Sequence, residues 1–226
     1  MNGIKKNLKT IPKIEKRSSH FYCKVSMKKS ILITGATGTV GKKALKQLCE
    51  NGNYHISVLC RKSSKNIKVL RPYLNHIKLI SIDLTREQDF EKLDETYDVV
   101  IHLAAVIPPL ADEEPELTHK VNFLGTKYLL NRLEKISPNC FFMYSSSIAV
   151  YGDRLSSPNI SVTDQLPEHE EDVYAQSKLD TEPIIMASKL EWTIFRLTAI
   201  MGVKNHKMTG LMFHMPLSTP MEICMP

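Results

Sequence analysis

The residues whose types and spacing could do chemistry begin with a tyrosine and a lysine in "YAQSK". Tyr174 and Lys178 stand four residues apart, and on a helix two side chains at that spacing project from one face. A free phenol, with a pKa of about 10, is a poor base at neutral pH, and a neighbouring ammonium stabilises the phenolate. The pair could therefore move a proton to or from a bound oxygen atom. An exposed helical pair without a chemical role is the alternative.

Three glycines spaced three residues apart follow a short apolar run in "ILITGATGTVG". The run predicts a strand over Ser30–Thr34, and a helical pattern follows over Val40–Asn51. In this context Gly35 permits a tight turn, Gly38 lets a pyrophosphate approach the backbone, and Gly41 lets the helix pack closely on the sheet. The N–H groups at the start of the helix would attract phosphates. The loop favours dinucleotide binding over an ordinary glycine turn.

Short apolar runs alternate with helical segments along most of the chain. The predicted strands are Ser30–Thr34, His55–Leu59, Ile77–Ile82, Val99–Leu103, Cys140–Ser145 and Trp192–Leu197. The predicted helices are Val40–Asn51, Lys65–Leu74, Glu87–Leu93, Pro115–Ile136 and Val173–Lys189. Several strands are apolar on successive residues, which is typical of a parallel sheet covered on both faces. The pattern predicts an α/β fold with a doubly wound parallel sheet and helices on both faces.

Five motifs follow one another in the chain: "TGATGTVG", "HLAA", "VNFLGT", "SSSIAVYG" and "YAQSK". In order and spacing they resemble the extended short-chain dehydrogenases/reductases, the NAD-dependent epimerase/dehydratase-like family. The resemblance extends from about Lys28 to Met201. It implies a Rossmann-type fold and an NAD(P)-dependent oxidoreductase or epimerase.

The resemblance implies a catalytic set of Ser147, Tyr174, Lys178 and Asn122. Tyr174 would exchange a proton with the substrate while the nicotinamide exchanges hydride, and Lys178 would tune Tyr174 and hold the nicotinamide ribose. Ser147 would hydrogen-bond the reacting oxygen, because it stands four residues before Tyr151 of "VYG", as in the family pattern. Asn122 of "VNFLGT" would support a water or backbone link near the lysine. A capped or solvated helical Asn is the alternative for that residue.

The resemblance also implies cofactor contacts at the strand ends. Asp83 and Leu84 of "SIDLT" would meet the adenine, and the small Ala104 and Ala105 would let the cofactor lie against the backbone. Without the family, Asp83 could cap the next helix, and the alanines could be core packing. The implied cofactor-binding residues are Gly35, Thr37, Gly38, Thr39, Val40, Gly41, Arg61, Asp83, Leu84, Leu103, Ala104, Ala105, Tyr174 and Lys178.

The end of the second strand discriminates between the two dinucleotides. An acid there hydrogen-bonds the ribose 2′-hydroxyl, whereas a base accommodates a 2′-phosphate. This chain has Cys60 where the acid is expected, followed by Arg61 and Lys62, and a guanidinium suits a phosphate. We therefore expect NADP(H) in preference to NAD(H). A solvated basic turn is the alternative.

Departures from related subfamilies narrow the reaction. Dehydratases of similar pattern carry Asp-Glu where this chain has Ile148 and Ala149, which cannot transfer protons. Epimerases similar to the galactose enzyme tend to carry a lysine at the place where this chain has Ile107, Pro108 and Pro109. What remains is an NADP(H)-dependent oxidoreductase acting on a carbonyl or secondary alcohol. The alternatives are a nucleotide-sugar epimerase and a catalytically silent NAD(P)-binding regulator.

Charge separates a leader from the body of the chain. The 226 residues carry a net charge of +6, and residues 1–26 hold seven Lys and Arg against one Glu, which leaves 23 bases and 23 acids in residues 27–226. We expect a basic, disordered leader over 1–26, a dinucleotide-binding domain over 27–201 and an incomplete substrate-binding region over 202–226. A targeting peptide and an electrostatic arm are the alternatives for the leader.

The remaining composition limits location and partners. Five scattered cysteines without C-x-x-C spacing indicate a reducing compartment, so a cytoplasmic protein is expected. The histidines show no metal-ligand spacing, and no metal site is expected. No apolar run reaches about eighteen residues, which argues against a membrane span, and the neutral body has no basic face for nucleic acid. The expected partner is a small-molecule substrate, and a homodimer is left open.

Overall fold

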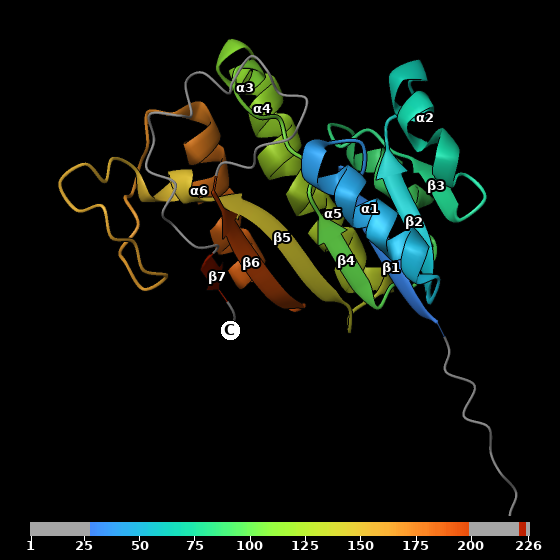
Figure 1. Cartoon of the computed structure of the whole chain (residues 1–226). Coiled ribbons are helices and arrows are strands. Elements are labelled where there is room, and N and C mark those ends of the chain that lie inside the picture. Colours follow the sequence, from blue (N-terminus) through green and yellow to red (C-terminus); the bar gives the residue numbers. More distant parts are fainter. Residues whose placement is uncertain (1–27, 199–221, 225–226) are drawn as a thin grey trace, which may run out of the picture.

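The structure is a computed structural model that describes residues 28–198 and 222–224. In this part of the chain the strands form one seven-stranded sheet in the order β3-β2-β1-β4-β5-β6-β7 (Figure 1). The strands β1 to β6 pair in parallel, and β7 pairs antiparallel with β6. The strands are β1 (Lys29–Thr34), β2 (Tyr54–Cys60), β3 (Ile77–Ser81), β4 (Val99–His102), β5 (Phe141–Ser147), β6 (Glu191–Leu197) and β7 (Glu222–Cys224). The parallel part has the strand order of a doubly wound dinucleotide-binding fold.

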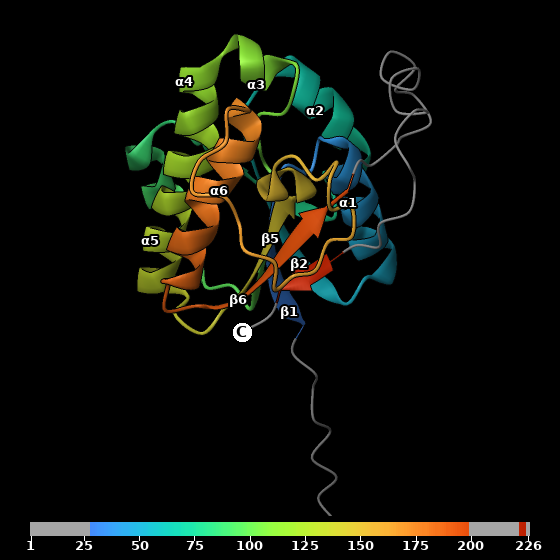
Figure 2. The ribbon, with the colours of Figure 1, turned by 90° about the vertical axis from the view of Figure 1, so that its left-hand side faces the viewer.

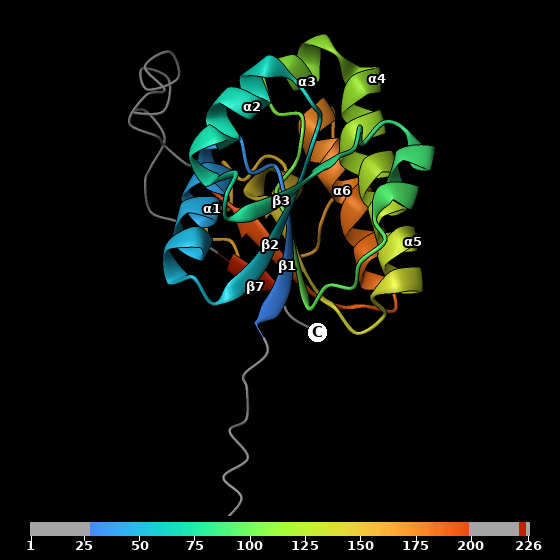
Figure 3. The ribbon, with the colours of Figure 1, turned by 90° about the vertical axis from the view of Figure 1, so that its right-hand side faces the viewer.

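Helices connect the parallel strands and cover both faces of the sheet. Figures 2 and 3 show α1 and α2 on one face and α4, α5 and α6 on the other. The α-helices are α1 (Thr39–Asn51), α2 (Ser64–Leu70), α3 (Leu110–Glu113), α4 (Pro115–Thr118), α5 (Gly125–Ile136) and α6 (Val173–Met186). The 3₁₀ segments are η1 (Arg71–Tyr73), η2 (Glu87–Lys92) and η4 (Ile148–Tyr151), and η3 (His119–Leu124) is a π-helix.

Successive residues of a central strand pack into different layers of the core. In β1, Leu32 belongs to the cluster that includes Leu129 of α5 and Ile185 of α6, whereas Ile33 belongs to the cluster that includes Leu45 of α1. Because both faces are covered, the strands need apolar residues on both sides, which explains their continuous apolar runs. Burying one side chain of this size contributes about 1.5–3 kcal/mol, so the two layers hold the strand ends in place.

The predicted α/β fold is confirmed, and the six predicted strands are present with ends shifted by at most two residues. The predicted helix over Pro115–Ile136 is confirmed at both ends, and within it α4, the π-helix η3 and α5 follow one another without a break, with the buried Asn122 in the π-turn. The predicted helix over Lys65–Leu74 divides into α2, which ends at Leu70, and η1, which contains Pro72. The predicted helix over Glu87–Leu93 is a 3₁₀ turn. The short α3 was not predicted, and α6 ends three residues early.

Parts of the predicted domain plan lie outside the described residues. These parts are the leader over 1–26 and most of the substrate region predicted over 202–226. Within that second region, Glu222–Cys224 pairs with β6 and so adds a strand to the sheet. In residues 28–198 and 222–224, no helix has both the length and the apolar character that crossing a bilayer requires.

Candidate active site

The predicted site residues gather at one edge of the sheet, where the parallel strands end. The glycine loop follows β1, Leu103 and its neighbours follow β4, and Ser147 is the last residue of β5. The helix α6 carries Tyr174 and Lys178, and the Lys178 amine reaches the end of β5. Doubly wound sheets bind ligands at this edge, near the point where the strand order reverses. The structure therefore brings the predicted nucleotide loop and the predicted catalytic residues to one place.

The glycine loop has the shape that a dinucleotide phosphate requires. Gly35 has φ +66°, and a Cβ on it would lie 2.6 Å from backbone atoms of Leu103 and Ala104, so only glycine fits. A Cβ on Gly41 would overlap the Gly35 carbonyl oxygen. The helix α1 begins after Gly38 with no side-chain cap and no acid in its first turn, so its N–H groups and dipole favour an anion. The other predicted contacts of this loop, at or just before the start of α1, are Thr37, Thr39 and Val40.

The basic segment after β2 presents Arg61 to solvent. The Arg61 side chain is exposed, while its carbonyl oxygen accepts a hydrogen bond from Asn66 Nδ2 at 2.8 Å. The Asn66 backbone N–H donates to Ser63 Oγ at 3.2 Å, and this caps α2. The segment thus has a defined backbone with a cationic side chain that a ligand can reach.

Asp83 closes a turn after β3. Its Oδ1 accepts hydrogen bonds from the N–H of Thr85 at 3.0 Å and from the Thr85 hydroxyl at 2.8 Å. The alternative that Asp83 caps the next helix is wrong, because the N-cap of η2 is Arg86. Leu84 is buried against α5, where a Cβ on Gly125 would lie 2.9 Å from the Leu84 Cβ and carbonyl oxygen.

Lys178 is buried among uncharged oxygen atoms, with 1% of its surface exposed. Its Nζ donates to the Ser145 carbonyl at 2.8 Å and to the Tyr144 hydroxyl at 3.1 Å, and lies 5.6 Å from the centre of the Tyr174 ring. Burial lowers the pKa of Lys178 to about 7, although the charge of Glu182 raises it. An amine whose pKa is moved this far by burial is characteristic of functional sites.

The Tyr174 phenol keeps its proton more firmly than the sequence predicted. Burial raises the pKa of Tyr174, the Ser147 hydroxyl lowers it, and the charge of Asp172 raises it further, so that the net change is upward. The expected lowering of this pKa involves Lys178 together with the positively charged nicotinamide ring, and in the chain alone the burial of the phenol has the larger effect. The amine of Lys178 is held by β5, and its own low pKa leaves it only partly charged at neutral pH. The phenol is therefore set to donate a proton at neutral pH.

The three serines that end β5 have different partners. The Ser145 hydroxyl donates to a carbonyl of β4 at 3.3 Å, and the Ser146 hydroxyl donates to the buried Glu182 at 2.6 Å. The Ser147 oxygen accepts a backbone N–H of η4 at 3.2 Å, and its hydroxyl acts on the Tyr174 phenol. These partners support the choice of Ser147 among the three.

Asn122 ties the segment after β4 to the helix that carries the lysine. It lies in η3 with 1% of its surface exposed. Its Oδ1 accepts the Val106 N–H at 2.7 Å, and its Nδ2 donates to the Val106 carbonyl at 3.0 Å and to the Ser177 hydroxyl at 2.9 Å. The expected water or backbone link thus takes the form of a backbone link to Val106. π-Turns are frequent at functional sites.

The buried His102 connects β1 to α5. Its Nδ1 lies 2.7 Å from Thr34 Oγ1, and its Nε2 lies 2.8 Å from Thr126 Oγ1. The Thr34 oxygen already accepts two backbone N–H groups after β4, at 3.2 and 3.1 Å, so its proton goes to Nδ1. Thr126 gives its own proton to the Asn122 carbonyl at 2.6 Å, so His102 donates from Nε2. Burial and the charge of Lys178 lower the pKa of His102 to about 3, which keeps the ring neutral.

A buried ion pair fastens α6 to the sheet. Arg196 of β6 donates to Glu182 through Nη2 at 2.8 Å and through Nε at 3.1 Å, with 4% and 1% of the two side chains exposed. Ser146 adds its hydroxyl to the same carboxylate. Arg196 also donates to the Tyr151 hydroxyl at 2.6 Å and lies over that ring. The pair joins α6, β5, β6 and η4, and its two-point geometry is the stronger kind of carboxylate contact.

Several residues that shape this site were not singled out from the sequence. They are Thr34, His102, Gly125, Thr126, Tyr144, Glu182 and Arg196. For Thr34 and His102 the signal is a polar residue at the end of an apolar strand run, as in "ILIT" and "VVIH". A buried polar side chain needs a hydrogen-bond partner, so such positions indicate a connection even when the partner is unknown.

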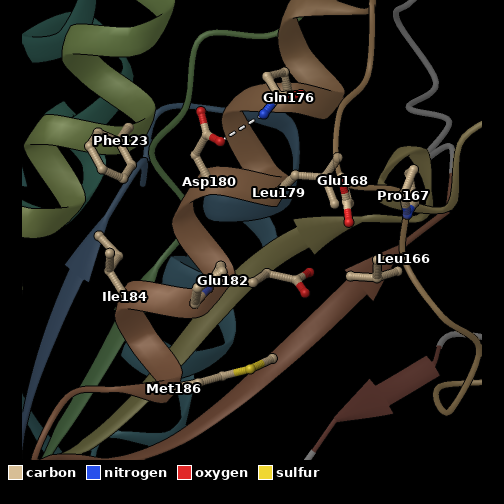
Figure 4. A pocket seen from close by; sticks show the side chains of 11 residues that line it. Phe123, Leu166, Pro167, Glu168, Gln176, Leu179, Asp180, Glu182, Ile184 and Met186 are labelled. Atoms are coloured by element: carbon tan, nitrogen blue, oxygen red, sulfur yellow. Dashed lines mark hydrogen bonds between the residues drawn. The ribbon is translucent and has the colours of Figure 1, made fainter.

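A groove of about 490 Å³ lies on the outer side of α6 (Figure 4). The lining residues are Phe123, Leu166, Pro167, Glu168, Gln176, Leu179, Asp180, Glu182, Pro183, Ile184 and Met186. Gln176, Asp180 and Pro183 follow helical spacing and share a face. Tyr174 and Lys178 lie on the opposite face, because they are offset by two residues from Gln176 and Asp180. Tyr174 and Lys178 therefore do not line the groove, although Glu182, one turn beyond Lys178 on α6, does.

Residues 31–217 match the model of the family described as NAD dependent epimerase/dehydratase. The match includes the glycine loop, Ser147, Tyr174 and Lys178, whose arrangement is described above. The chain belongs to this family. It is an extended short-chain dehydrogenase/reductase, and its relatives include oxidoreductases and epimerases.

Relatives of this epimerase/dehydratase-family chain have different activities. It is 29% identical to D-erythronate dehydrogenase of Haemophilus influenzae over 143 residues, 61% of this chain and 44% of that protein. It is 29% identical to UDP-glucose 4-epimerase 2 of Arabidopsis thaliana over 208 residues, 86% and 57% of the two. A solved UDP-Glc/GlcNAc 4-epimerase of Campylobacter jejuni is 26% identical, with a TM-score of 0.64 over 74% and 52% of the two chains. The chain spans about half the length of the curated relatives it matches.

Lys178→Met should change the free energy of unfolding by an amount that depends on pH. The lysine pKa is 10.5 in the unfolded chain and about 7 in the fold. Below pH 7 both states carry the charge, so the full penalty of its burial opposes folding. Between these values the folded amine loses its proton first, so the wild type gains stability as the pH rises. The free energy of unfolding of Lys178→Met, taken relative to that of the wild type, should therefore be highest at low pH.

Urea unfolding of wild type and variant at about pH 6.5 and about pH 9.5 measures this difference. The exposed Lys46→Met is the matched control, since its side chain is 56% exposed, and its effect should be the same at both pH values. A Lys178→Met effect that does not change with pH would contradict the burial of a titrating amine.

Glu182→Gln should lower the free energy of unfolding by about 3 kcal/mol, because it removes a carboxylate that compensates the buried Arg196 guanidinium. The matched control is Glu91→Gln, which breaks the exposed pair of Glu91 with Arg132. That pair is 2.8 Å apart, and the Glu91 side chain is 71% exposed. The control should cost less than about 1 kcal/mol. Equal losses in urea unfolding would show that the ion pair does not fasten α6.

Proposed function

We propose that the chain is an NADP(H)-dependent oxidoreductase that transfers hydride between the nicotinamide and a carbonyl or secondary alcohol. The observation that carries this proposal is that Ser147, Tyr174 and Lys178 lie close together at the carboxyl ends of the parallel strands, where the glycine loop also lies. Family membership supports it, because the family contains dehydrogenases such as the D-erythronate enzyme.

Each side chain of the proposed site has a task that follows from its contacts. Tyr174 gives a proton to the substrate oxygen, and its raised pKa keeps that proton in place near neutral pH. Ser147 donates a second hydrogen bond to the same oxygen, because its own oxygen already accepts the N–H of Ala149. Lys178 supplies positive charge beside the phenol, which stabilises phenolate once the proton has left. When bound, the cofactor gives or takes the hydride, and its oxidised form adds a further positive charge.

The glycine loop and the segment after β2 support NADP(H) as the cofactor. Gly35 and Gly41 leave room that a Cβ would fill, and α1 offers an uncapped N-terminus for the phosphates. At the end of β2, Cys60 stands in place of a ribose-binding acid, and Arg61 is exposed beside it. Thr37, Asp83 and Ala104 complete the proposed contacts along the sheet edge.

A nucleotide-sugar epimerase is the second candidate. Similarity to UDP-glucose 4-epimerase 2 over 86% of this chain favours it. The segment Ile107–Pro109 has no basic side chain, and this favours the reductase instead. An epimerase returns the hydride to its substrate and consumes no cofactor, so net oxidation of NADPH separates the two.

We also propose a reducing, cytoplasmic location. Cys49, Cys60 and Cys140 are free thiols, and burial raises the pKa of each. A raised pKa leaves little reactive thiolate, so these side chains are suited to remaining reduced.

Arg61→Ala should weaken NADPH binding roughly tenfold while changing NADH affinity less than about twofold, because the lost charge-assisted hydrogen bonds involve only the 2′-phosphate. Fluorescence titration of both nucleotides measures the two dissociation constants. Arg71→Ala, an exposed arginine in η1, is the matched control and should leave both constants unchanged. Equal affinity of the wild type for NADPH and NADH, unaffected by Arg61→Ala, would remove the NADP assignment.

Tyr174→Phe should lower NADPH-dependent reduction about 100-fold or more, since it removes the proton donor, and should change the dissociation constant of NADPH less than about twofold. The probes are a panel of aliphatic and aromatic aldehydes and ketones, with UDP-glucose as the test for epimerisation. Tyr128→Phe on α5 is the matched control. NADPH oxidation that survives in Tyr174→Phe would overturn the mechanism, and conversion of UDP-glucose without net NADPH oxidation would establish the epimerase.

A further inference from the structure

The amine of Lys178 is held by two oxygen atoms of the same strand. Its Nζ lies 2.8 Å from the Ser145 carbonyl oxygen and 3.1 Å from the Tyr144 hydroxyl oxygen, and both residues belong to β5. A protonated amine has three N–H bonds. Two of them are directed at β5, so the third is left for the side of the amine that faces the Tyr174 ring, 5.6 Å away.

Among the titratable groups around this amine, Tyr144 is the one that hydrogen-bonds to it directly. Tyr174 and Glu182 face it from α6, His102 from β4 and Tyr144 from β5. The Glu182 carboxylate binds Arg196 and a serine hydroxyl, and His102 is neutral. The charge of Lys178 is therefore stabilised by nearby neutral oxygen atoms and by a carboxylate that other groups share.

Tyr144 is itself fixed in place and protonated. It is 1% exposed, and its ring stacks on His102 with 5.7 Å between centres and 27° between planes. Burial raises the pKa of Tyr144 far above its ordinary value, and its hydroxyl is hydrogen-bonded to Thr181. Thr181 gives its own proton to the Ser177 carbonyl at 2.6 Å, so its oxygen accepts the phenol proton. The Tyr144 oxygen thus always presents a lone pair to Lys178.

We propose that Tyr144 is a positioning residue for Lys178: its hydroxyl oxygen and the Ser145 carbonyl orient the amine and favour its protonated form, and so direct its remaining N–H toward Tyr174. The catalytic meaning of this role rests on the proposed function. Tyr144 needs no contact with substrate or cofactor, because it acts through the lysine. Its neutral oxygen orients the ammonium without cancelling the positive charge that a phenolate at Tyr174 would use.

The test is the titration of the Lys178 amine in Tyr144→Phe, followed by NMR of ¹⁵N-labelled lysine side chains, with Lys178→Arg to assign the signal. The substitution keeps the ring that stacks on His102 and removes only the acceptor oxygen. The Lys178 pKa should fall by about one unit, because a hydrogen bond to a charged group is worth roughly that much. Tyr128→Phe is the matched control and should leave the titration unchanged.

A Lys178 pKa that is the same in wild type and Tyr144→Phe, or that rises in the variant, would overturn the proposal. Circular dichroism checks that the variant is folded. If it is not, Thr181→Val decides: removal of the group that accepts the phenol proton weakens the phenol oxygen as an acceptor, so the Lys178 pKa should fall by a smaller amount, and an unchanged value would overturn the proposal.

The NMR titration needs neither substrate nor cofactor, so it tests Tyr144 independently of the reaction. Failure of the proposed function would appear as unchanged turnover in Tyr174→Phe, whatever the Lys178 titration shows. Where turnover is found, the pH profile of NADPH oxidation should move to lower pH by the same amount in Tyr144→Phe. A purely structural role for Tyr144 would lower stability without moving that profile.

Discussion

The ion pair between Glu182 and Arg196 is the contact on which the placement of α6, the helix that carries Tyr174 and Lys178, depends. Tyr174, Lys178 and Glu182 follow one another at intervals of four residues on α6, so they lie along one stripe of the helix surface. A carboxylate fixed at two points by β6 and at a third by Ser146 therefore sets the rotation of the helix. Rotation about the helix axis would move the phenol and the amine away from β5. The positions of the phenol and the amine thus depend on Glu182, one helical turn after Lys178.

Two sets of buried hydrogen bonds next to this helix share one acceptor, the carbonyl oxygen of Asn122. One runs from Thr34 through His102 and Thr126 to the carbonyl of Asn122. The other involves Thr181, whose hydroxyl lies 3.3 Å from the same carbonyl. In a medium of low dielectric constant, polar groups that all find partners give rigidity. The glycine loop at the end of β1 and the helix with the phenol are thereby held at a fixed separation, and the proposed reaction would need such a separation.

The sequence predicts the strands well because their apolar runs report burial on both faces, and it predicts the glycine loop because Gly35 and Gly41 occupy positions that no side chain can fill. The helix over Pro115–Ile136 has the predicted bounds, but its helical periodicity does not reveal the π-turn η3 within it. Within that turn Asn122 makes a tertiary contact, two hydrogen bonds to the backbone of Val106. A pattern within one segment carries no information about such a contact.

The candidate site divides in the same way. The Tyr-Lys pair follows from spacing within one helix, so the sequence shows it. The pKa of Tyr174 depends also on the burial of the folded phenol, which raises it and which the spacing of the pair does not reveal. His102 and Tyr144 each stand in an apolar strand, and their importance comes from partners that lie 24 and 34 residues away in the chain. Those partners become known only when the strands are arranged in the sheet.

The surroundings of Lys178 show how function and stability are balanced in this fold. A carboxylate in direct contact would hold the amine more firmly, but it would also neutralise the positive charge that a phenolate at Tyr174 would use in the proposed reaction. Neutral oxygens from β5 orient the amine and leave its charge uncompensated, and the penalty of burying that charge appears as the lowered pKa. The apolar layers on both faces of the sheet and the ion pair at Glu182 supply the stability that offsets this penalty. A weakly compensated lysine can therefore persist where the chemistry requires it.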